Sequence, residues 1–549
     1  MEPASTMIKD TEVDMKDVEL SEMDPEKQPM TGDGQAAAAA EKNGSVKLKV
    51  PEDEVAFTGL SKDELMKVAG TPGWVRTRFV LLILFWLGWI GMLAGAIVII
   101  VQAPRCKPIP EMNWWNEGPL YEISDTEAFS DGLKGIESKL DNINQLKVKG
   151  LVLGPLHTVQ ADQPNTLDLE KFDPRQGTKD ELLGVLEKAH RKGINVMLDL
   201  TPNYLGSRPW FTPVEKDVQK VKAAAEYWLG LGVDGIKVSD LAIASGSAEW
   251  AKLQDVIQKN SSQDGKRRAL MGAVKNVSPT NASQLLNTSG VDLLQSDLVS
   301  TNIGGSELIN TMDTLNSEQR SLGWGFGEQL SKQAKTPGLI RLYHLLLFTL
   351  PGTPIFKYGD EIGLPPGQGS EPPKMIWDLE KEPAEGEADN GTVKTETLKP
   401  GELRNWFISL SDLRGKERSL LHGDYYSLSS SDTSLAFLRL WDQSERYITA
   451  VNWGTAPETL AFKLATPEVK LPETAKVKLS TDDDLKEESS RQPGEANSGS
   501  GESGPSAVPL QRLKMATNGR KFKMMLKIGP SVLQKSDLPL QFQLFLFGF

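Results

Sequence analysis

Residues 232–241, GVDGIKVSDL, have the pattern of a buried β-strand that ends in an acidic corner. Ile236 and Val238 supply apolar side chains, and Ser239 and Asp240 close the run. A short apolar run bounded by turn residues is typical of a strand in the interior of a covered sheet. The fold then depends on what alternates with this strand along the chain.

Similar runs recur on both sides of it, separated by amphipathic helical patterns. In one of these, Thr178 and Glu181 form a predicted capping box ahead of an apolar stripe. Eight strands that alternate with helices predict a (β/α)8 TIM barrel, which we expect over residues 114–400. The strand candidates are residues 120–123, 150–157, 195–204, 233–240, 269–274, 291–297, 322–327 and 353–363.

The pattern changes at about residue 401. Short alternating runs such as 435–441 and 446–453 predict an antiparallel β-sandwich over residues 401–549. Residues 484–507 are rich in Glu, Ser, Gly and Pro and indicate a flexible loop within it. Residues 514–549 mix basic and apolar side chains without a strand pattern, so the sequence assigns them no element.

Composition excludes several classes of function. The net charge is -13, which argues against a nucleic-acid partner. The single cysteine excludes an internal disulfide, and the four histidines are too scattered to suggest a zinc motif. With no nucleotide fingerprint visible either, we expect no metal and no cofactor.

One segment indicates a membrane protein. Residues 79–101 are 23 positions without a charge, and a helix of that length rises roughly 34 Å, enough to span a bilayer. A cleaved signal peptide is the alternative, because Ala94 and Ala96 imitate a cleavage site, but its apolar region would be shorter. We therefore expect a signal-anchor helix over residues 75–101, in contact with membrane lipids.

The flanks of this segment predict its orientation. Four basic residues (Lys62, Lys67, Arg76 and Arg78) precede it and two (Arg105 and Lys107) follow, which favours a cytosolic N-terminus and a type II protein. Residues 1–74 have a net charge of -8 and predict a mostly disordered tail, with a short amphipathic helix over 57–68 capped by Ser61 and Glu64. Extracellular sequons are expected to carry glycans at Asn260, Asn276, Asn281, Asn287 and Asn390.

Two features of the anchor and neck suggest a partner. Gly88, Gly91 and Gly95 form a smooth face on which another transmembrane helix can pack, although glycine is also common in membrane helices in general. Cys106 lies in the expected neck, residues 102–113. An unpaired extracellular cysteine indicates either an intermolecular disulfide or a reactive free thiol.

The stretch TLPGTPIFKYGDEIGL, residues 349–364, resembles the last barrel strand of the α-amylase superfamily. LDLTPNY and GVDGIKVSDL occur before it in the order expected for that superfamily. The resemblance implies a nucleophilic aspartate where this chain has Ser239. Asp240 comes one residue late, and a shift of one residue reverses the direction of a side chain along a strand.

Other catalytic positions also depart from the pattern. Asp199 and Asn203 are kept, but Tyr204 stands where a histidine is expected, and residues 269–276 lack the glutamate of a general acid. A retaining glycosidase needs two carboxyl groups about 5–5.5 Å apart. We therefore predict a degenerate, catalytically inactive glycosidase-like barrel. After Tyr204 the chain also has no room for the domain that amylases insert there.

With the anchor, GWVRTR (residues 73–78), Cys106 and KVKGLVLGP (residues 147–155), the chain resembles the glycoprotein heavy chains of heteromeric amino-acid transporters over residues 7–513. This resemblance implies a disulfide from Cys106 to a multi-spanning light chain, which the heavy chain stabilises and brings to the plasma membrane. It also implies sodium-independent exchange of neutral or cationic amino acids, and association with integrin β subunits in adhesion signalling. The alternatives are a membrane-anchored glycosidase that uses Asp240, and an adhesion or receptor module without a transport role.

Overall fold

The computed structural model describes residues 61–102, 106–158, 160–259, 267–299, 303–334, 336–367, 371–379, 399–454, 458–460, 462, 471, 474–480, 507–509, 513–515 and 523–528. The chain divides into two units, residues 1–103 and 104–549. Several predictions lie outside the described residues: those for residues 1–60, for Asn260 and Asn390, and for the loop over residues 484–506.

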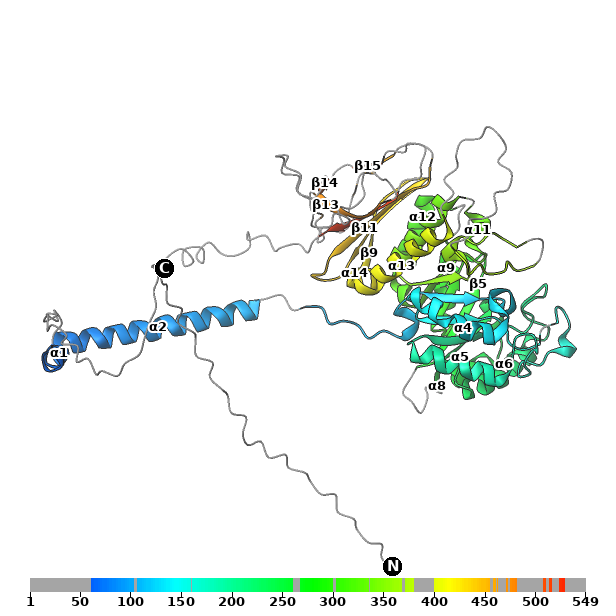
Figure 1. Cartoon of the computed structure of the whole chain (residues 1–549), viewed down its shortest axis with the longest axis horizontal. Helices are drawn as coiled ribbons and strands as arrows, with labels where there is room; N and C mark the ends of the chain where they lie inside the picture. Colours follow the sequence, from blue (N-terminus) through cyan, green and yellow to red (C-terminus); the bar gives the residue numbers. More distant parts are fainter. Residues whose placement is uncertain are drawn as a thin grey trace, which may run out of the picture. The chain divides into compact units, whose positions relative to one another are not determined.

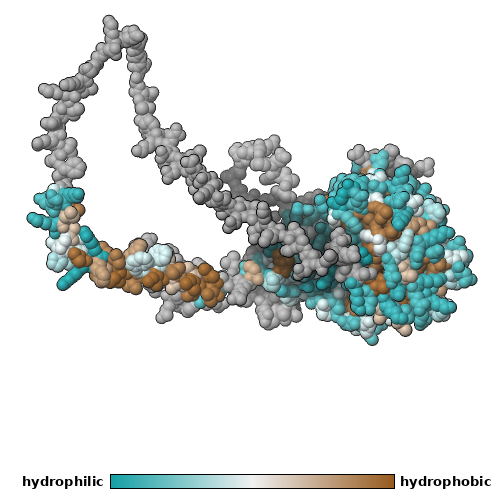
Figure 2. Space-filling model, turned by 90° about the horizontal axis from the view of Figure 1, so that it is seen from below, coloured by the Kyte–Doolittle hydropathy of each residue, from teal (hydrophilic) through white to brown (hydrophobic). Residues whose placement is uncertain are grey.

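The first unit contains two helices, α1 (Lys62–Ala69) and α2 (Pro72–Gln102) (Figure 1). The predicted capping box of α1 is confirmed, since Ser61 Oγ accepts from the Glu64 N–H and the Glu64 carboxylate accepts from the Ser61 N–H. Helix α2 has a mean hydropathy of 2.4 in its most apolar window and is the one described helix long and apolar enough to cross a membrane. Its surface is hydrophobic along most of its length (Figure 2).

The second unit is built on a closed barrel of eight parallel strands in sequence order, which confirms the predicted fold. Leu120 pairs with Ile355 where the first strand meets the last. Each observed strand lies within a predicted range. The strands are β1 (Leu120–Ile123), β2 (Gly150–Leu153), β3 (Asn195–Asp199), β4 (Gly235–Ser239), β5 (Ala269–Val274), β6 (Leu293–Ser296), β7 (Leu322–Trp324) and β8 (Thr353–Lys357).

Helices surround the barrel (Figure 1). The capping box at Thr178 and Glu181 is confirmed at the start of α5. The helices are α3 (Thr126–Ser130), α4 (Gly132–Gln145), α5 (Lys179–Arg191), α6 (Val214–Gly230), α7 (Leu241–Ala244), α8 (Trp250–Lys259), α9 (Pro279–Ser289), α10 (Gly305–Thr314), α11 (Leu330–Gln333) and α12 (Pro337–Thr349). Short 3₁₀ turns are η1 (Trp114–Asn116), η2 (Pro164–Thr166), η3 (Asn316–Ser321) and η4 (Asp360–Ile362).

The region after the barrel begins with helices rather than strands. Helices α13 (Pro400–Lys416) and α14 (Arg418–Leu421) precede the first strand, which starts at Asp424 and not near residue 401. The reason is that α13 packs on α12 and completes the helical layer. Sequence analysis overlooked this because α13 shows only a weak apolar stripe, with Leu403, Phe407 and Leu410 buried.

The antiparallel C-terminal region is a six-stranded sheet in the order β14-β13-β16-β11-β10-β9 and a pair, β12 with β15. Its strand β16 lies in the stretch that the sequence left unassigned. Two buried arginines contact the chain between α12 and β8: Arg414 of α13 donates to the carbonyls of Phe348, Leu350 and Gly352, and Arg439 of β10 joins the sheet to that of Thr349. The strands are β9 (Asp424–Ser430), β10 (Ser434–Leu440), β11 (Arg446–Asn452), β12 (Glu458–Leu460), β13 (Thr474–Ser480), β14 (Ala507–Pro509), β15 (Leu513–Met515) and β16 (Lys523–Ile528).

Candidate functional site

Several polar side chains from different strands meet inside the barrel, because side chains alternate in direction along each strand. Leu120, Met197 and Leu293 belong to the apolar layer of the interior. Because side chains two residues apart point to the same side of a strand, the next inward positions on β1, β3 and β6 hold polar residues. They are Glu122, Asp199 and Gln295, and β4 adds Lys237 two residues after Gly235.

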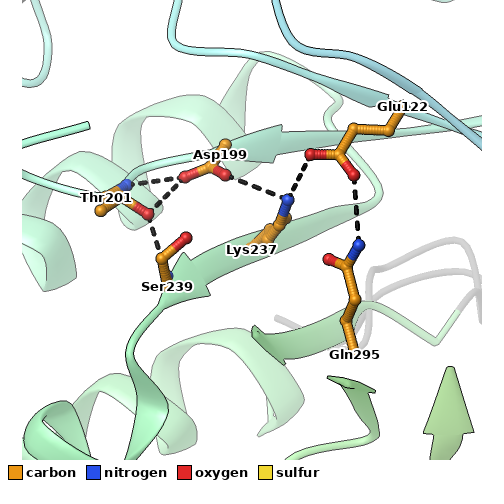
Figure 3. A network of polar contacts seen from close by, with 6 residues as sticks. All are labelled: Glu122, Asp199, Thr201, Lys237, Ser239 and Gln295. Carbon is orange, nitrogen blue, oxygen red and sulfur yellow. Dashed lines mark hydrogen bonds and ion pairs between the residues drawn. The ribbon is translucent and has the colours of Figure 1, made fainter. Parts of the chain in front are cut away.

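These residues form one buried network (Figure 3). Lys237 Nζ lies 2.7 Å from Glu122 Oε1 and 3.4 Å from Asp199 Oδ2. Gln295 Nε2 donates to Glu122 Oε2 at 3.2 Å. Asp199 Oδ1 accepts from the backbone N–H of Thr201 at 3.0 Å and from its hydroxyl at 2.5 Å. Each of these five side chains belongs to a residue that is at most 8% exposed.

The charges in this network shift the pKa values of one another. Burial would raise the pKa of Glu122, but the charges of Lys237 and Lys357 outweigh it and bring the pKa to about 2. Burial would lower the pKa of Lys237, and the two carboxylates raise it instead. For Asp199 burial dominates and raises the pKa, although Lys237 and Thr201 oppose it. Glu122 is therefore ionised at physiological pH and cannot donate a proton as a general acid.

Ser239 ends β4 at the position that the resemblance gives to a nucleophile. Its backbone N–H donates to Thr201 Oγ1 at 2.9 Å, and its carbonyl accepts from the indole N–H of Trp210 at 2.7 Å. Strand β5 carries no acidic side chain. Both carboxylates of the network, on β1 and β3, instead contact the ammonium of Lys237.

The remaining degenerate positions lie around this network. Asn203 is buried and joins two loops, because its side chain bonds both the backbone and the carboxylate of Asp162. Burial, and then the charges of Asp199 and Glu122, raise the pKa of Tyr204. Asp240 is half-buried at the start of α7 with φ 51°, and its side chain makes no capping hydrogen bond. The structure therefore groups Asp199, Asn203, Tyr204 and Ser239 but leaves Asp240 apart from the network.

The other predicted sites lie elsewhere. Cys106 is exposed and free. Asn276, Asn281 and Asn287 are exposed in or just before α9. On α2, a Cβ added at Gly88, Gly91 or Gly95 would meet nothing within 4 Å among the described residues. No cluster of three or more metal-ligating side chains occurs in the described part of the chain.

Glu122 and Gln295 were not predicted from the sequence, and Lys237 had no predicted partner. Strands β1 and β4 each carry a signal that could have identified the pair: a single charged residue within an otherwise apolar run, LYEI in β1 and GIKVS in β4. Charged side chains are almost never fully buried unless they are paired. Two opposite charges on different strands of one barrel therefore suggest each other as partners.

Comparisons with known proteins match two parts of the chain to family models. The model of the solute carrier family 3 member 2 N-terminus matches residues 45–121, and that of the alpha amylase catalytic domain matches residues 121–229. The second match covers β1 to α6 and ends before β4, the strand with Lys237 and Ser239.

Whole-chain comparisons give relatives of two kinds. The amino acid transporter heavy chain SLC3A2 of Rattus norvegicus is 46% identical over 87% of this chain and 94% of that protein. The protein of the same name from Oryctolagus cuniculus is 44% identical over 86% of this chain and 94% of that protein. Among solved structures, the acarbose-soaked debranching enzyme of Nostoc punctiforme aligns with a TM-score of 0.55 over 77% of this chain and 100% of that one. At 17% identity this second likeness shows the fold alone.

Proposed function

Because the chain belongs to the family of amino acid transporter heavy chains that includes SLC3A2, we propose how it performs that role. It is a single-span type II subunit that anchors a multi-spanning light chain, stabilises it and brings it to the plasma membrane. The observation that carries the proposal is the 46% identity to a heavy chain over 87% of this sequence.

The division of labour follows from the number of apolar helices. Alternating access requires several helices around a site in the membrane, and α2 is the one described helix of suitable length and composition. The light chain therefore supplies the pathway and selects neutral or cationic amino acids. The glycine face of α2 gives it a surface on which to pack.

Cys106 supplies the covalent link in this proposal. It is exposed, and as the single cysteine of the chain it has no internal partner. On the extracellular side of a plasma membrane such a thiol forms stable disulfides. Glycans at the exposed Asn276, Asn281 and Asn287, and association with integrin β subunits, are parts of the proposal that rest on the sequons and on the resemblance.

We expect Cys106→Ser to abolish a reducible high-mass complex in native membranes. Wild type should run on gels without reductant as a larger species that collapses to the monomer when reductant is added, and mass spectrometry of that species should identify a multi-spanning transporter. The variant should run as a monomer under both conditions. A control variant, Ser444→Ala, leaves the thiol intact and should behave as wild type.

If wild type runs as a monomer without reductant, Cys106 is a free thiol and the covalent assembly is refuted. Amino-acid uptake then decides between the remaining readings. Uptake that is unchanged when the protein is depleted would favour an adhesion or receptor module instead of a transporter subunit.

We further propose that the barrel is not a glycosidase. Support comes from the Lys237 ammonium between the Glu122 and Asp199 carboxylates, from Ser239 at the end of β4, and from the lack of an acidic side chain on β5. The purified chain should show no turnover of α-glucosides above the buffer rate. Turnover that Asp240→Asn abolishes would contradict this and restore the enzyme hypothesis.

A further inference from the structure

A second polar site lies outside the barrel interior. A cavity of about 300 Å³ opens between α4, η4, the segment around Trp377 and α13. It is separate from the network at Lys237, because its barrel contribution is Tyr121, an outward-facing residue of β1. Cavities of this size are at the lower end of small-molecule sites, so the ligand would be no larger than an amino acid or a short acid.

Apolar side chains supply part of the walls, beside the polar groups of Asn142, Glu361, Asp378 and Arg404. Ile143 of α4 and Leu146, the residue just after that helix, are buried in one wall, and Ile362 of η4 is buried in another. Met375 and Leu379, both partly buried, belong to the lining segment around Trp377. Walls of this kind favour a compact branched or linear hydrocarbon group.

Glu361 and Arg404 have opposite charge types and line the same cavity. No hydrogen bond or ion pair joins them within the described residues, and burial outweighs the effect of the Arg404 charge on the pKa of Glu361. Glu361 is 2% exposed, and its Oε1 accepts from the Tyr121 hydroxyl at 2.8 Å. Its Oε2 has no hydrogen-bond partner among the described residues. A buried carboxyl oxygen without a partner is unusual and calls for one outside the chain.

The second group is the guanidinium of Arg404 on α13. It is partly exposed and donates to the carbonyl of Asn142 at 2.9 Å and to Gln145 Oε1 at 3.1 Å, both uncharged acceptors. Arg404 forms no ion pair within the described residues. These hydrogen bonds fix the guanidinium at the wall of the cavity, and its charge remains available to an anion.

We propose that this cavity binds a free α-amino acid with an apolar side chain. The carboxylate of the ligand pairs with Arg404, its ammonium pairs with Glu361, and its side chain lies among the apolar walls. A plain carboxylic acid would leave Glu361 Oε2 without a partner, and a plain amine would leave Arg404 without an anionic one. The site belongs to the heavy chain itself and does not depend on the disulfide or on the light chain.

The experiment is calorimetric titration of the purified full-length chain in detergent at pH 7. The probes are leucine, 4-methylpentanoate, which lacks the amine, and 3-methylbutylamine, which lacks the carboxylate. Losing one charged hydrogen-bonded contact should weaken binding about tenfold or more, so leucine should bind more tightly than both analogues. Arg404→Met should reduce leucine affinity to that of the amine, and Glu361→Gln to that of the acid. Glu402→Gln, an exposed neighbour of Arg404, is the matched control and should bind as wild type.

Measuring the protons released on binding adds a second test, because Glu361 would release none if it had only a structural role. Burial raises the pKa of Glu361 to about 7, and an ammonium beside it would lower that pKa, so binding at pH 7 should release protons. The heat should then vary with the ionisation enthalpy of the buffer for wild type but not for Glu361→Gln. No saturable heat with leucine, or equal affinity for leucine and 4-methylpentanoate, would overturn the proposal, and water would be the occupant beside Glu361.

Discussion

Replacing Lys237 with methionine should destabilise the barrel by about 3–5 kcal/mol, which is the usual cost of removing one partner from a buried ion pair. Methionine keeps most of the volume of the side chain but removes the ammonium that lies 2.7 Å from Glu122 and 3.4 Å from Asp199. Asp199 would then be buried without a cation, and Glu122 would keep only the charge of Lys357. The measurement is urea unfolding of the full-length chain in detergent, followed by tryptophan fluorescence.

Two variants separate this effect from a general loss of charge. Lys252 Nζ lies 2.8 Å from Glu249, a distance like that in the buried pair, but its side chain is 62% exposed. Lys252→Met should therefore cause no measurable loss, because exposed ion pairs contribute little. The double variant Lys237→Met with Glu122→Gln removes one orphaned charge and should recover part of the stability. A loss at Lys237 no larger than at Lys252 would show that Glu122 and Asp199 do not depend on it.

The barrel could be predicted because each of its strands and helices shows a recognisable pattern within its own short stretch of sequence. Each strand is a short apolar run, and each helix carries a stripe or a capping box, as at Thr178 and Glu181. The order of strands in a closed parallel barrel then follows the order in the sequence. By contrast, α13 and β16 carry weak local patterns, and α13 takes its place because it packs on α12.

The network at Lys237 was harder to foresee because it is formed by long-range pairing. Glu122 and Lys237 are 115 residues apart, and they meet because β1 and β4 present inward positions at a similar height. A family pattern indicated that Ser239 and Asp199 were of interest, but it did not identify Glu122, Thr201 or Gln295. Comparison with the family pattern identified positions such as Ser239 that differ from it. The pairing of Lys237 with Glu122 and Asp199 could be seen only in the structure.

The second large effect concerns the adjacent carboxyls Asp360 and Glu361 at the end of β8. Burial is the main reason that the pKa of each is raised to about 7, and each residue is at most 3% exposed. A folded-state pKa above the unfolded value of about 4 means that the folded protein holds its protons more tightly. The resulting stabilisation is fully present below about pH 4 and is lost as the pH rises through 7. The loss is on the order of 3 kcal/mol for each group.

The two amide replacements should have opposite outcomes because the two carboxyls have different partners. Asp360 accepts from the backbone N–H of Leu330 at 2.8 Å and of Lys357 at 2.9 Å, one at each oxygen. In Asp360→Asn one of these acceptors becomes a donor that faces an N–H, so the variant should be less stable than wild type at pH 5, where Asp360 is protonated. Glu361 Oε1 accepts from the Tyr121 hydroxyl, and its Oε2, which has no hydrogen-bond partner among the described residues, can become an NH₂ group at little cost.

Glu361→Gln should therefore be about as stable as wild type at pH 5 and more stable at pH 8.5, because it carries no charge to bury. Urea unfolding of both chains between these values tests this, and the comparison is made at each pH because other groups titrate as well. His157, for example, has its pKa lowered to about 4 by burial, so its contribution rises with pH where that of Glu361 falls. Subtracting the two curves cancels His157 and leaves the titration of Glu361. A difference that stays constant from pH 5 to 8.5 would mean that Glu361 is already ionised in the folded protein, which its burial argues against.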